Sequence, residues 1–264
     1  GRSTINDVAK LAEVGAITVS RMLRDPAKLS PALRDRIEKA IKELNYVPDP
    51  KARALASGQA NVIGVLVPSL SNIGFADRLR GIQDGLDNTG YQIQIGNTRY
   101  DSDEEDRLIP LFIGQRPAGL IVTGLDQSPK ARRLLKNCGL PLVQIMETTT
   151  APLDTVIGFS HEAAGAVVAD HLLAGGYSRI GIIAARMDPR VRRRLQGFQA
   201  ALDRAGLTLG GREATSPEAS SVSRGRALMR WLLQRFPDTD AVFCANDDLA
   251  LGALFECQAR GLPV

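Results

Sequence analysis

From residue 61 onward, the chain alternates short apolar runs with longer helix-like stretches. The apolar runs have the length of buried strands and lie at residues 62–67, 91–96, 119–123, 142–145, 155–159, 179–184 and 241–245. The helix-like stretches lie at residues 75–88, 103–115, 129–138, 161–174, 191–205, 221–235 and 247–260. Strands separated by helices form parallel sheets with both faces covered. The pattern restarts near residue 160, so we expect an α/β core of two doubly wound subdomains, at residues 61–160 and 161–264.

Polar residues that follow the strands are candidates for a ligand site, because ligands bind at the carboxyl ends of strands in such sheets. Ser71 and Asn72 follow the first strand and can hydrogen-bond hydroxyl groups, and Phe75 can stack on the face of a sugar ring. Asn246 and Asp247 follow the last strand and also suit sugar hydroxyls. We therefore expect these five residues in a cleft between the two subdomains.

Residues 4–23 predict two short helices joined by a tight turn, an arrangement that can place the second helix in the major groove of DNA. Thr4 and Asp7 form a capping box at the start of the first helix, and Gly15 lies in the turn. The first helix has a predicted buried face of Val8, Leu11 and Ala12.

The second helix is expected to pack inward through Val19, Met22 and Leu23. Its outer surface then carries one arginine for a guanine edge, hydroxyl groups for phosphates and apolar groups for thymine methyls. This outer set is Ala16, Ile17, Thr18, Ser20, Arg21 and Arg24. The alternative is a helical hairpin with a solvated polar face, and Ile17 could instead serve headpiece packing.

A third helix is predicted from the Ser30–Pro31 cap to about residue 44, which completes an all-α headpiece over residues 1–48. The charge distribution supports a separate role for this end of the chain. The first 60 residues hold 11 basic and 7 acidic side chains, whereas the remaining 204 residues hold 22 of each. A basic headpiece before a neutral core is expected when the headpiece meets phosphates and the core meets a small molecule.

Several classes of protein lack support in the sequence. The three cysteines and two histidines have no metal-ligand spacing, and we expect neither a metal nor another cofactor. Phosphate-binding, dinucleotide-binding and nucleophile-elbow motifs are absent, so we expect no catalytic residues and no enzyme. No apolar run has the length of a membrane span, so we expect no membrane partner and a cytoplasmic, nucleoid-associated protein.

Five segments carry a resemblance to a known family. They are DVAKLA at 7–12, TVSRML at 18–23, AIKELNYVPD at 40–49, ARALASG at 52–58 and IGVLVPSLSN at 63–72. From Thr4 to Pro68 the chain closely resembles the lactose-repressor (LacI) family of transcription regulators. The resemblance implies a periplasmic-binding-protein-like core, a homodimer or higher oligomer, and a pseudo-palindromic DNA operator. It also implies further βα units after Val264, so we expect the second sheet to be incomplete.

The resemblance assigns roles to residues that contact DNA. Arg21 is expected to bind guanine O6 and N7, while Ala16 and Ile17 occupy positions where base specificity varies within the family. Further contacts are expected from Thr4, Thr18, Ser20, Arg24 and Lys51. Residues 49–60 would form a hinge helix and linker in which Leu55 inserts between base steps in the minor groove. The alternative is that these residues are an ordinary linker.

The family also implies roles in the ligand cleft. An effector-binding arginine is common where Arg192 stands, so we expect Arg192 and Arg186 to point inward and Arg190, Arg193 and Arg194 to be solvated or stabilising. The alternative is a helix start with a charged outer face. Family members often carry an aromatic residue where this chain has Gly74, which predicts extra room there.

The effector class follows from two observations. An arginine-lined cleft favours an anion, because a guanidinium can bind a carboxylate through two hydrogen bonds. The segments at 14–26, 184–188 and 243–258 are most similar to the gluconate-repressor branch, which responds to gluconate or 2-ketogluconate. We therefore expect a repressor of sugar-acid catabolism genes that its effector releases from DNA. The alternative is a periplasmic-type sugar-binding protein without a regulatory role.

Overall fold

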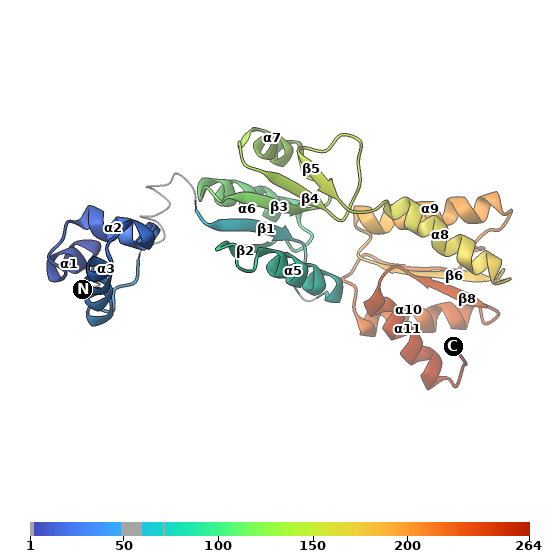
Figure 1. Cartoon of the computed structure of the whole chain (residues 1–264). Coiled ribbons are helices and arrows are strands. Elements are labelled where there is room, and N and C mark those ends of the chain that lie inside the picture. The colour runs from blue at the N-terminus through green and yellow to red at the C-terminus, as the bar shows by residue number, and fades with distance from the viewer. Residues whose placement is uncertain (1–2, 49–59, 71) are drawn as a thin grey trace. The chain divides into compact units, whose positions relative to one another are not determined.

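The computed structural model of the 264-residue chain describes residues 3–48, 60–70 and 72–264 (Figure 1). Contacts between Cα atoms divide the chain into two compact units, Gly1–Ala60 and Asn61–Val264. Each unit has its own hydrophobic core.

The N-terminal unit is a small helical domain. Its elements are α1 (Ile5–Leu11), α2 (Ala16–Arg24), the short 3₁₀ helix η1 (Pro26–Lys28) and α3 (Pro31–Glu43). The core contains one fully buried side chain from each α-helix, and these are Val8, Val19 and Ile37. Burying apolar side chains of this size contributes about 1.5–3 kcal/mol each, which is substantial for so small a unit.

The structure confirms one local prediction for the N-terminal unit, the capping box, and corrects those for Leu11 and Ser30. Leu11 was expected in the core but is 42% exposed, and Ala9 is buried beside Val8 instead. The predicted capping box is present: the Thr4 side chain accepts from the Asp7 amide, and the Asp7 carboxylate accepts from the Thr4 amide at 2.8 Å. Ser30 lies at the N-cap of α3, but its side chain makes no capping hydrogen bond.

The first sheet of the second unit has five parallel strands in the order β2-β1-β3-β4-β5. The strands are β1 (Val62–Val67), β2 (Gln92–Asn97), β3 (Gly119–Thr123), β4 (Leu142–Ile145) and β5 (Thr155–Ile157). Helices α6 (Ser102–Gly114) and α7 (Pro129–Asn137) cover one face, with Phe112 packed among strand side chains. Helix α5 (Ile73–Leu86) covers the other face, where Phe75 packs on Val65 and Val67. This sheet is therefore doubly wound, as predicted.

The second sheet has three parallel strands in the order β7-β6-β8. The strands are β6 (Ile180–Ala185), β7 (Glu213–Ser216) and β8 (Ala241–Cys244). Helices α8 (His161–Ala174) and α9 (Pro189–Arg204) pack together on one side, while α10 (Val222–Arg235) and α11 (Asp247–Ala259) pack together on the other (Figure 1). Strand β7 was not predicted from the sequence.

Glycines set the close approach of α8 and α9. A Cβ atom on Gly197 would lie 1.8 Å from the Glu162 carbonyl oxygen, and one on Gly165 would lie 1.9 Å from the Arg194 carbonyl oxygen. Neither backbone atom can move without separating the helices, so both positions require glycine. The contact brings the start of α8 against the middle of α9.

Among the described residues, no helix is both long enough and apolar enough to cross a membrane.

Candidate ligand pocket and nucleic-acid interface

Helix α2 presents a mixed apolar and basic surface. Val19 and Met22 face the core, whereas Ile17 is 77% exposed and Ser20 and Arg21 are also exposed. Arg24 is exposed at the end of the helix, and Ala16 and Thr18 are half-buried. The side chains expected to contact DNA thus lie on the surface of α2, and the exposure of Ile17 weighs against a packing role for it.

Basic side chains gather at the end of α2. Arg21, Arg24, Asp25 and Lys28 line one shallow hollow, in which the Lys28 Nζ lies 2.9 Å from an Asp25 carboxylate oxygen. No carboxylate pairs with Arg21 or Arg24 within the described part of the chain, so both guanidinium groups are available to an external anion. Lys28 was not among the predicted contacts, and helical spacing does not indicate it, because it lies in η1 beyond the end of α2.

The remaining predicted DNA contacts have different positions. The Thr4 hydroxyl donates to the Asp7 carboxylate at 2.8 Å, and the hydrogen bonds from the Thr4 backbone and side chain lower the pKa of Asp7. Thr4 is thus mainly a capping residue whose exposed surface is free for further contacts. Lys51 and Leu55, with the predicted hinge segment, lie outside the described residues.

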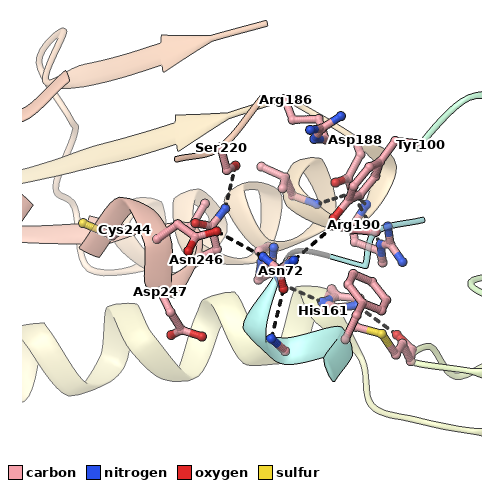
Figure 2. A pocket seen from close by; sticks show the side chains of 18 of the residues that line it. Asn72, Tyr100, His161, Arg186, Asp188, Arg190, Ser220, Cys244, Asn246 and Asp247 are labelled. Carbon is pink, nitrogen blue, oxygen red and sulfur yellow. Dashed lines mark hydrogen bonds and ion pairs between the residues drawn. The ribbon is translucent and has the colours of Figure 1, made fainter. Parts of the chain in front are cut away.

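In the second unit, a cavity of about 340 Å³ lies between the two sheets. The first turns of four helices, α5, α8, α9 and α11, contribute to its wall (Figure 2). The N-terminus of a helix carries a partial positive charge and favours anions. Such a convergence therefore suits a ligand that has acidic groups.

Three of these helices begin with a polar cap beside the cavity. Asn72 caps α5 by accepting from the Gly74 amide at 3.1 Å, and Asp188 caps α9 by accepting from the Arg190 amide at 2.9 Å. Asn246 caps α11 and donates to the Ser220 hydroxyl at 2.8 Å. Since each cap satisfies its own helix, the side chains are held in fixed orientations at the rim.

Four arginines line the cavity together with two aromatic rings. Arg186 lies 4.1 Å from the centroid of the Tyr100 ring, and Arg190 lies 5.6 Å from the same centroid. Arg190 and Arg78 each lie 5.7 Å from the centroid of Phe75. These cation–π contacts orient the guanidinium groups against the aromatic rings.

The buried His161 contacts the half-buried Arg194 at the crossing of α8 and α9. The Arg194 Nη1 donates to His161 Nδ1 at 3.3 Å, so the opposite ring nitrogen carries the proton and donates to the Met146 carbonyl at 2.9 Å. Burial and the adjacent Arg194 charge lower the pKa of His161 to about 4, which keeps the ring neutral. The Arg194 Nε is buried and finds no acceptor among the described residues. An acidic ligand could supply that acceptor.

Arg193 connects the two sheets outside the cavity. It donates to the Glu147 carboxylate at 2.8 Å and to both carboxylate oxygens of Asp126. Glu147 and Asp126 follow strands of the first sheet, whereas Arg193 belongs to α9 of the second. Burial raises the pKa of Glu147, and the Arg193 charge opposes this shift. A second contact between the halves joins the Asn72 amide to Asp248 at 3.3 Å.

Five of the seven predicted ligand-binding residues line the cavity, namely Asn72, Phe75, Arg186, Asn246 and Asp247. Ser71 lies outside the described residues. The expected inward direction of Arg192 is wrong: this side chain is exposed, and its Nε donates to the Met187 carbonyl at 2.7 Å. Arg190 and Arg194 line the cavity instead, because residues four apart share one face of a helix and the residue midway lies on another.

The space expected beside Gly74 is also corrected. The Arg78 side chain folds back over the first turn of α5, and its Nη1 donates to the Gly74 carbonyl oxygen. A Cβ atom on Gly74 would lie only 2.8 Å from this nitrogen. The Arg78 guanidinium therefore occupies the space that a larger side chain at residue 74 would need.

Nothing in the sequence indicated the backbone conformation of three pocket residues, of which Arg186 alone was predicted to bind the ligand. Tyr100, Met146 and Arg186 have positive φ angles of 60°, 69° and 67° just after their strands. Such angles are uncommon in residues other than glycine, and no residue type here indicated them. His161 opens a predicted helix, but a lone histidine in that place carries no specific meaning.

Comparison with known proteins identifies the family. Residues 60–264 match the periplasmic binding proteins and sugar-binding domain of the LacI family, and residues 4–49 match the bacterial regulatory proteins of the lacI family. The chain belongs to the LacI family of transcriptional regulators. Both the predicted family and the predicted architecture are confirmed, and membership makes the chain a DNA-binding regulator rather than an enzyme.

Individual relatives agree with this assignment. The regulator GntR of Pseudomonas aeruginosa is 42% identical over 264 residues, covering 100% of this chain and 77% of its own length. A LacI-family regulator of Silicibacter pomeroyi has a TM-score of 0.92 at 36% identity, covering 99% of this chain and 79% of that structure. The lac repressor dimer bound to operator and the anti-inducer ONPF has a TM-score of 0.83 at 26% identity, covering 100% and 80%. The chain is therefore similar to GntR-type regulators along its whole length.

Proposed function

We propose that this chain is a cytoplasmic, homodimeric repressor that reads a pseudo-palindromic operator through α2 and leaves it when a sugar acid binds between the two sheets. Gluconate and 2-ketogluconate are the proposed effectors. The observation that carries this proposal is the set of pocket arginines without carboxylate partners. Among the described residues, Arg78, Arg186 and Arg194 form no ion pair, although all three line the cavity.

An uncompensated guanidinium in a half-enclosed cavity is costly unless a ligand supplies the counter-charge. A carboxylate is suited to this role, because it accepts two parallel hydrogen bonds from one guanidinium. The hydroxyl groups of a sugar acid would find Asn246, Asp247 and Ser220 on the neighbouring wall. The similarity to GntR regulators, together with the resemblance of three segments to the gluconate-repressor branch, supports the same ligand class.

The proposed DNA contacts follow from the exposed surface of α2. Arg21 would bind a guanine edge, Ile17 would contact thymine methyls, and Arg24 with Lys28 would contact phosphates. Ala16, Thr18 and Ser20 complete the reading surface, and Leu55 with Lys51 would act in the minor groove as a hinge segment. The solved complex of the related lac repressor dimer with its operator supports this mode of binding.

Coupling requires that the effector bind two arrangements of the sheets with different affinity. The cavity wall is shared by both sheets, so a bound acid would favour one relative placement of the two. Contacts that join the sheets directly, such as Arg193 with Glu147 and Asp126, would then be adjusted. In a dimer this adjustment would alter the spacing of the two hinge segments and release the operator.

Fluorescence anisotropy with the full chain tests the proposal. The DNA would be an operator fragment found by footprinting the upstream region of the chain's own gene, with a random duplex of equal length as control. We expect preference for the operator at moderate salt and its loss on adding gluconate or 2-ketogluconate, but not glucose. Equal binding to both duplexes would refute the DNA-reading role, and release by glucose alone would refute the sugar-acid effector.

A further inference from the structure

We infer that the effector carries two acidic groups, one for each wall of the cavity, and that Gly74 and Arg78 together select for the second. This inference rests on the proposed sugar-acid function and narrows it to a chemical class. The class comprises sugar diacids and phosphorylated sugar acids, which share an acidic group at each end of a polyhydroxylated chain.

The wall formed by α5 carries the charge of Arg78. Arg78 lines the cavity, and the only hydrogen bond found for it among the described residues runs from Nη1 to the Gly74 carbonyl oxygen of its own helix. The rest of its guanidinium forms no ion pair within the described ranges. It therefore presents free N–H donors and a full positive charge beside the N-terminus of α5, which is itself electropositive.

Glycine at residue 74 makes room for this arginine. Gly74 lies within helix α5 and has no positive φ angle, so its backbone does not require glycine. Its role is steric, since a Cβ atom would lie 2.8 Å from the Arg78 Nη1 and 3.2 Å from the Asn72 Oδ1. The arginine is the flexible member of this group and would be displaced. Glycine thus allows Arg78 to lie across the first turn of the helix.

The opposite wall carries two further arginines. Arg194 and Arg190 lie there on α9, and the Arg194 Nε lacks an acceptor among the described residues. The carboxylate of Asp248 on that side is hydrogen-bonded to Asn72, and Asp188 caps α9 and lies 3.5 Å from Arg190. Neither of these carboxylates is paired with Arg78. A ligand with one carboxylate at Arg194 would leave the charge of Arg78 without a counter-ion.

The size of the cavity agrees with a ligand that reaches both walls. A volume of about 340 Å³ lies at the lower end of the range for small-molecule pockets and accommodates a six-carbon chain with an acidic group at each end. Hydroxyl groups along such a chain would meet the polar side chains between the walls.

Calorimetric titration of the full chain tests the inference with three probes: gluconate, glucarate and 6-phosphogluconate. We expect at least one of the two dianionic probes to bind about tenfold more tightly than gluconate, the size expected for one additional charge-assisted interaction. Tighter binding of glucarate would indicate a second carboxylate on the effector, and tighter binding of 6-phosphogluconate would indicate a phosphate. Arg78→Gln should reduce this preference by about tenfold, because glutamine keeps a donor but loses the charge.

Two further variants separate the steric role of Gly74 from damage to the helix. Gly74→Ala should lose the preference for the dianionic probe while unfolding at the same or a higher temperature, because alanine favours helices. Arg80→Gln is the matched control: Arg80 lies on the same helix, is exposed and pairs with Asp77 at 3.0 Å. The control should bind all three probes as the unmodified chain does.

The outcomes separate this inference from the proposed function. If gluconate binds and releases the operator but neither dianionic probe binds more tightly, the second acidic group is refuted and the sugar-acid function stands. If Arg78→Gln weakens all three probes equally, Arg78 does not select for a second acid and the inference fails. If none of the three acids binds, the sugar-acid function itself is refuted, and the inference with it.

Discussion

Replacing Arg194 by methionine should raise the free energy of unfolding of this chain and weaken its binding of an acidic ligand. Arg194 holds a desolvated charge, and burial lowers the pKa of its guanidinium. Its Nε is buried and has no acceptor within the described part of the chain. Methionine keeps most of the volume of the side chain and removes both the charge and the orphaned donor. We therefore expect a more stable protein that no longer binds an acid.

The magnitudes follow from the contacts. A buried donor without an acceptor costs about 1–3 kcal/mol, whereas the lost hydrogen bond to His161 is long at 3.3 Å and contributes about 1 kcal/mol. The free energy of unfolding should thus rise by about 1 kcal/mol. Loss of a charge-assisted contact to the ligand should reduce the binding free energy by about 2–3 kcal/mol. The dissociation constant would then rise roughly 30- to 150-fold.

Both quantities can be measured on the full chain. Trp231 is the single tryptophan and lies on α10, so its fluorescence during urea unfolding reports on the unit that contains the pocket. Calorimetric titration with gluconate gives the affinity. Arg192→Met is the matched control, because Arg192 lies on the same helix but is exposed and outside the cavity. The control should change stability by no more than about 0.5 kcal/mol and leave the gluconate affinity unaltered.

Two results would refute this reasoning. If Arg194→Met lowers the free energy of unfolding, the guanidinium stabilises the ligand-free fold rather than destabilising it. If Arg192→Met weakens gluconate binding and Arg194→Met does not, Arg192 rather than Arg194 binds the effector. Titration of the His161 ring by NMR adds an independent readout, because removing the adjacent charge should raise its pKa from about 4.

The remaining predictions concern DNA binding, pH and the contact between the sheets. Arg21→Ala should weaken operator binding by about 1–3 kcal/mol in anisotropy titrations, and an equal loss on random duplex would contradict base reading. His161 has a folded-state pKa of about 4, below the unfolded value of about 6.5, so its contribution to stability is complete above pH 6.5 and is lost as the pH falls toward 4. The free energy of unfolding should fall by as much as about 3 kcal/mol through this titration. In urea unfolding, His161→Gln should therefore show a smaller change of stability between pH 6.5 and 4 than the unmodified chain. Arg193→Met should lower the free energy of unfolding by about 1–3 kcal/mol, because Glu147 stays buried without its partner. This loss of stability should be larger at pH 8 than at pH 5, because the folded-state pKa of Glu147 rises further without the cation. A loss that does not depend on pH would indicate that Arg193 stabilises the fold through packing instead.

The sequence predicted the strands that are buried runs of apolar residues. β1, β3 and β4 have the predicted bounds, because each is flanked by helices and covered on both faces. β7 was missed for the opposite reason. It is an edge strand with the sequence EATS, in which only Ala214 and Ser216 are buried, so no apolar pattern marks it.

The site was predictable where function coincides with local structure. Asn72 and Asn246 are N-caps that follow strands, and both signals are local in the sequence. The choice among the arginines of α9 was not predictable in the same way. It depends on where the helix begins, at Pro189, and a shift of two residues along a helix turns a side chain by about 200°. Tyr100 was missed because its direction depends on a positive φ angle after β2.

A ligand can shift an equilibrium between two arrangements only to the extent that it binds them with different affinity. An acid whose contacts were all with the wall that carries Arg194 would move with one sheet and would bind both arrangements equally. An acid that also contacts Arg78 must span both walls, so its affinity depends on the distance between them. On this argument the second cation determines more than the choice of effector, because it makes binding sensitive to the relative placement of the sheets. Arg78→Gln should therefore reduce effector-induced release of the operator more than it reduces effector binding, and operator titrations at saturating effector would measure the difference.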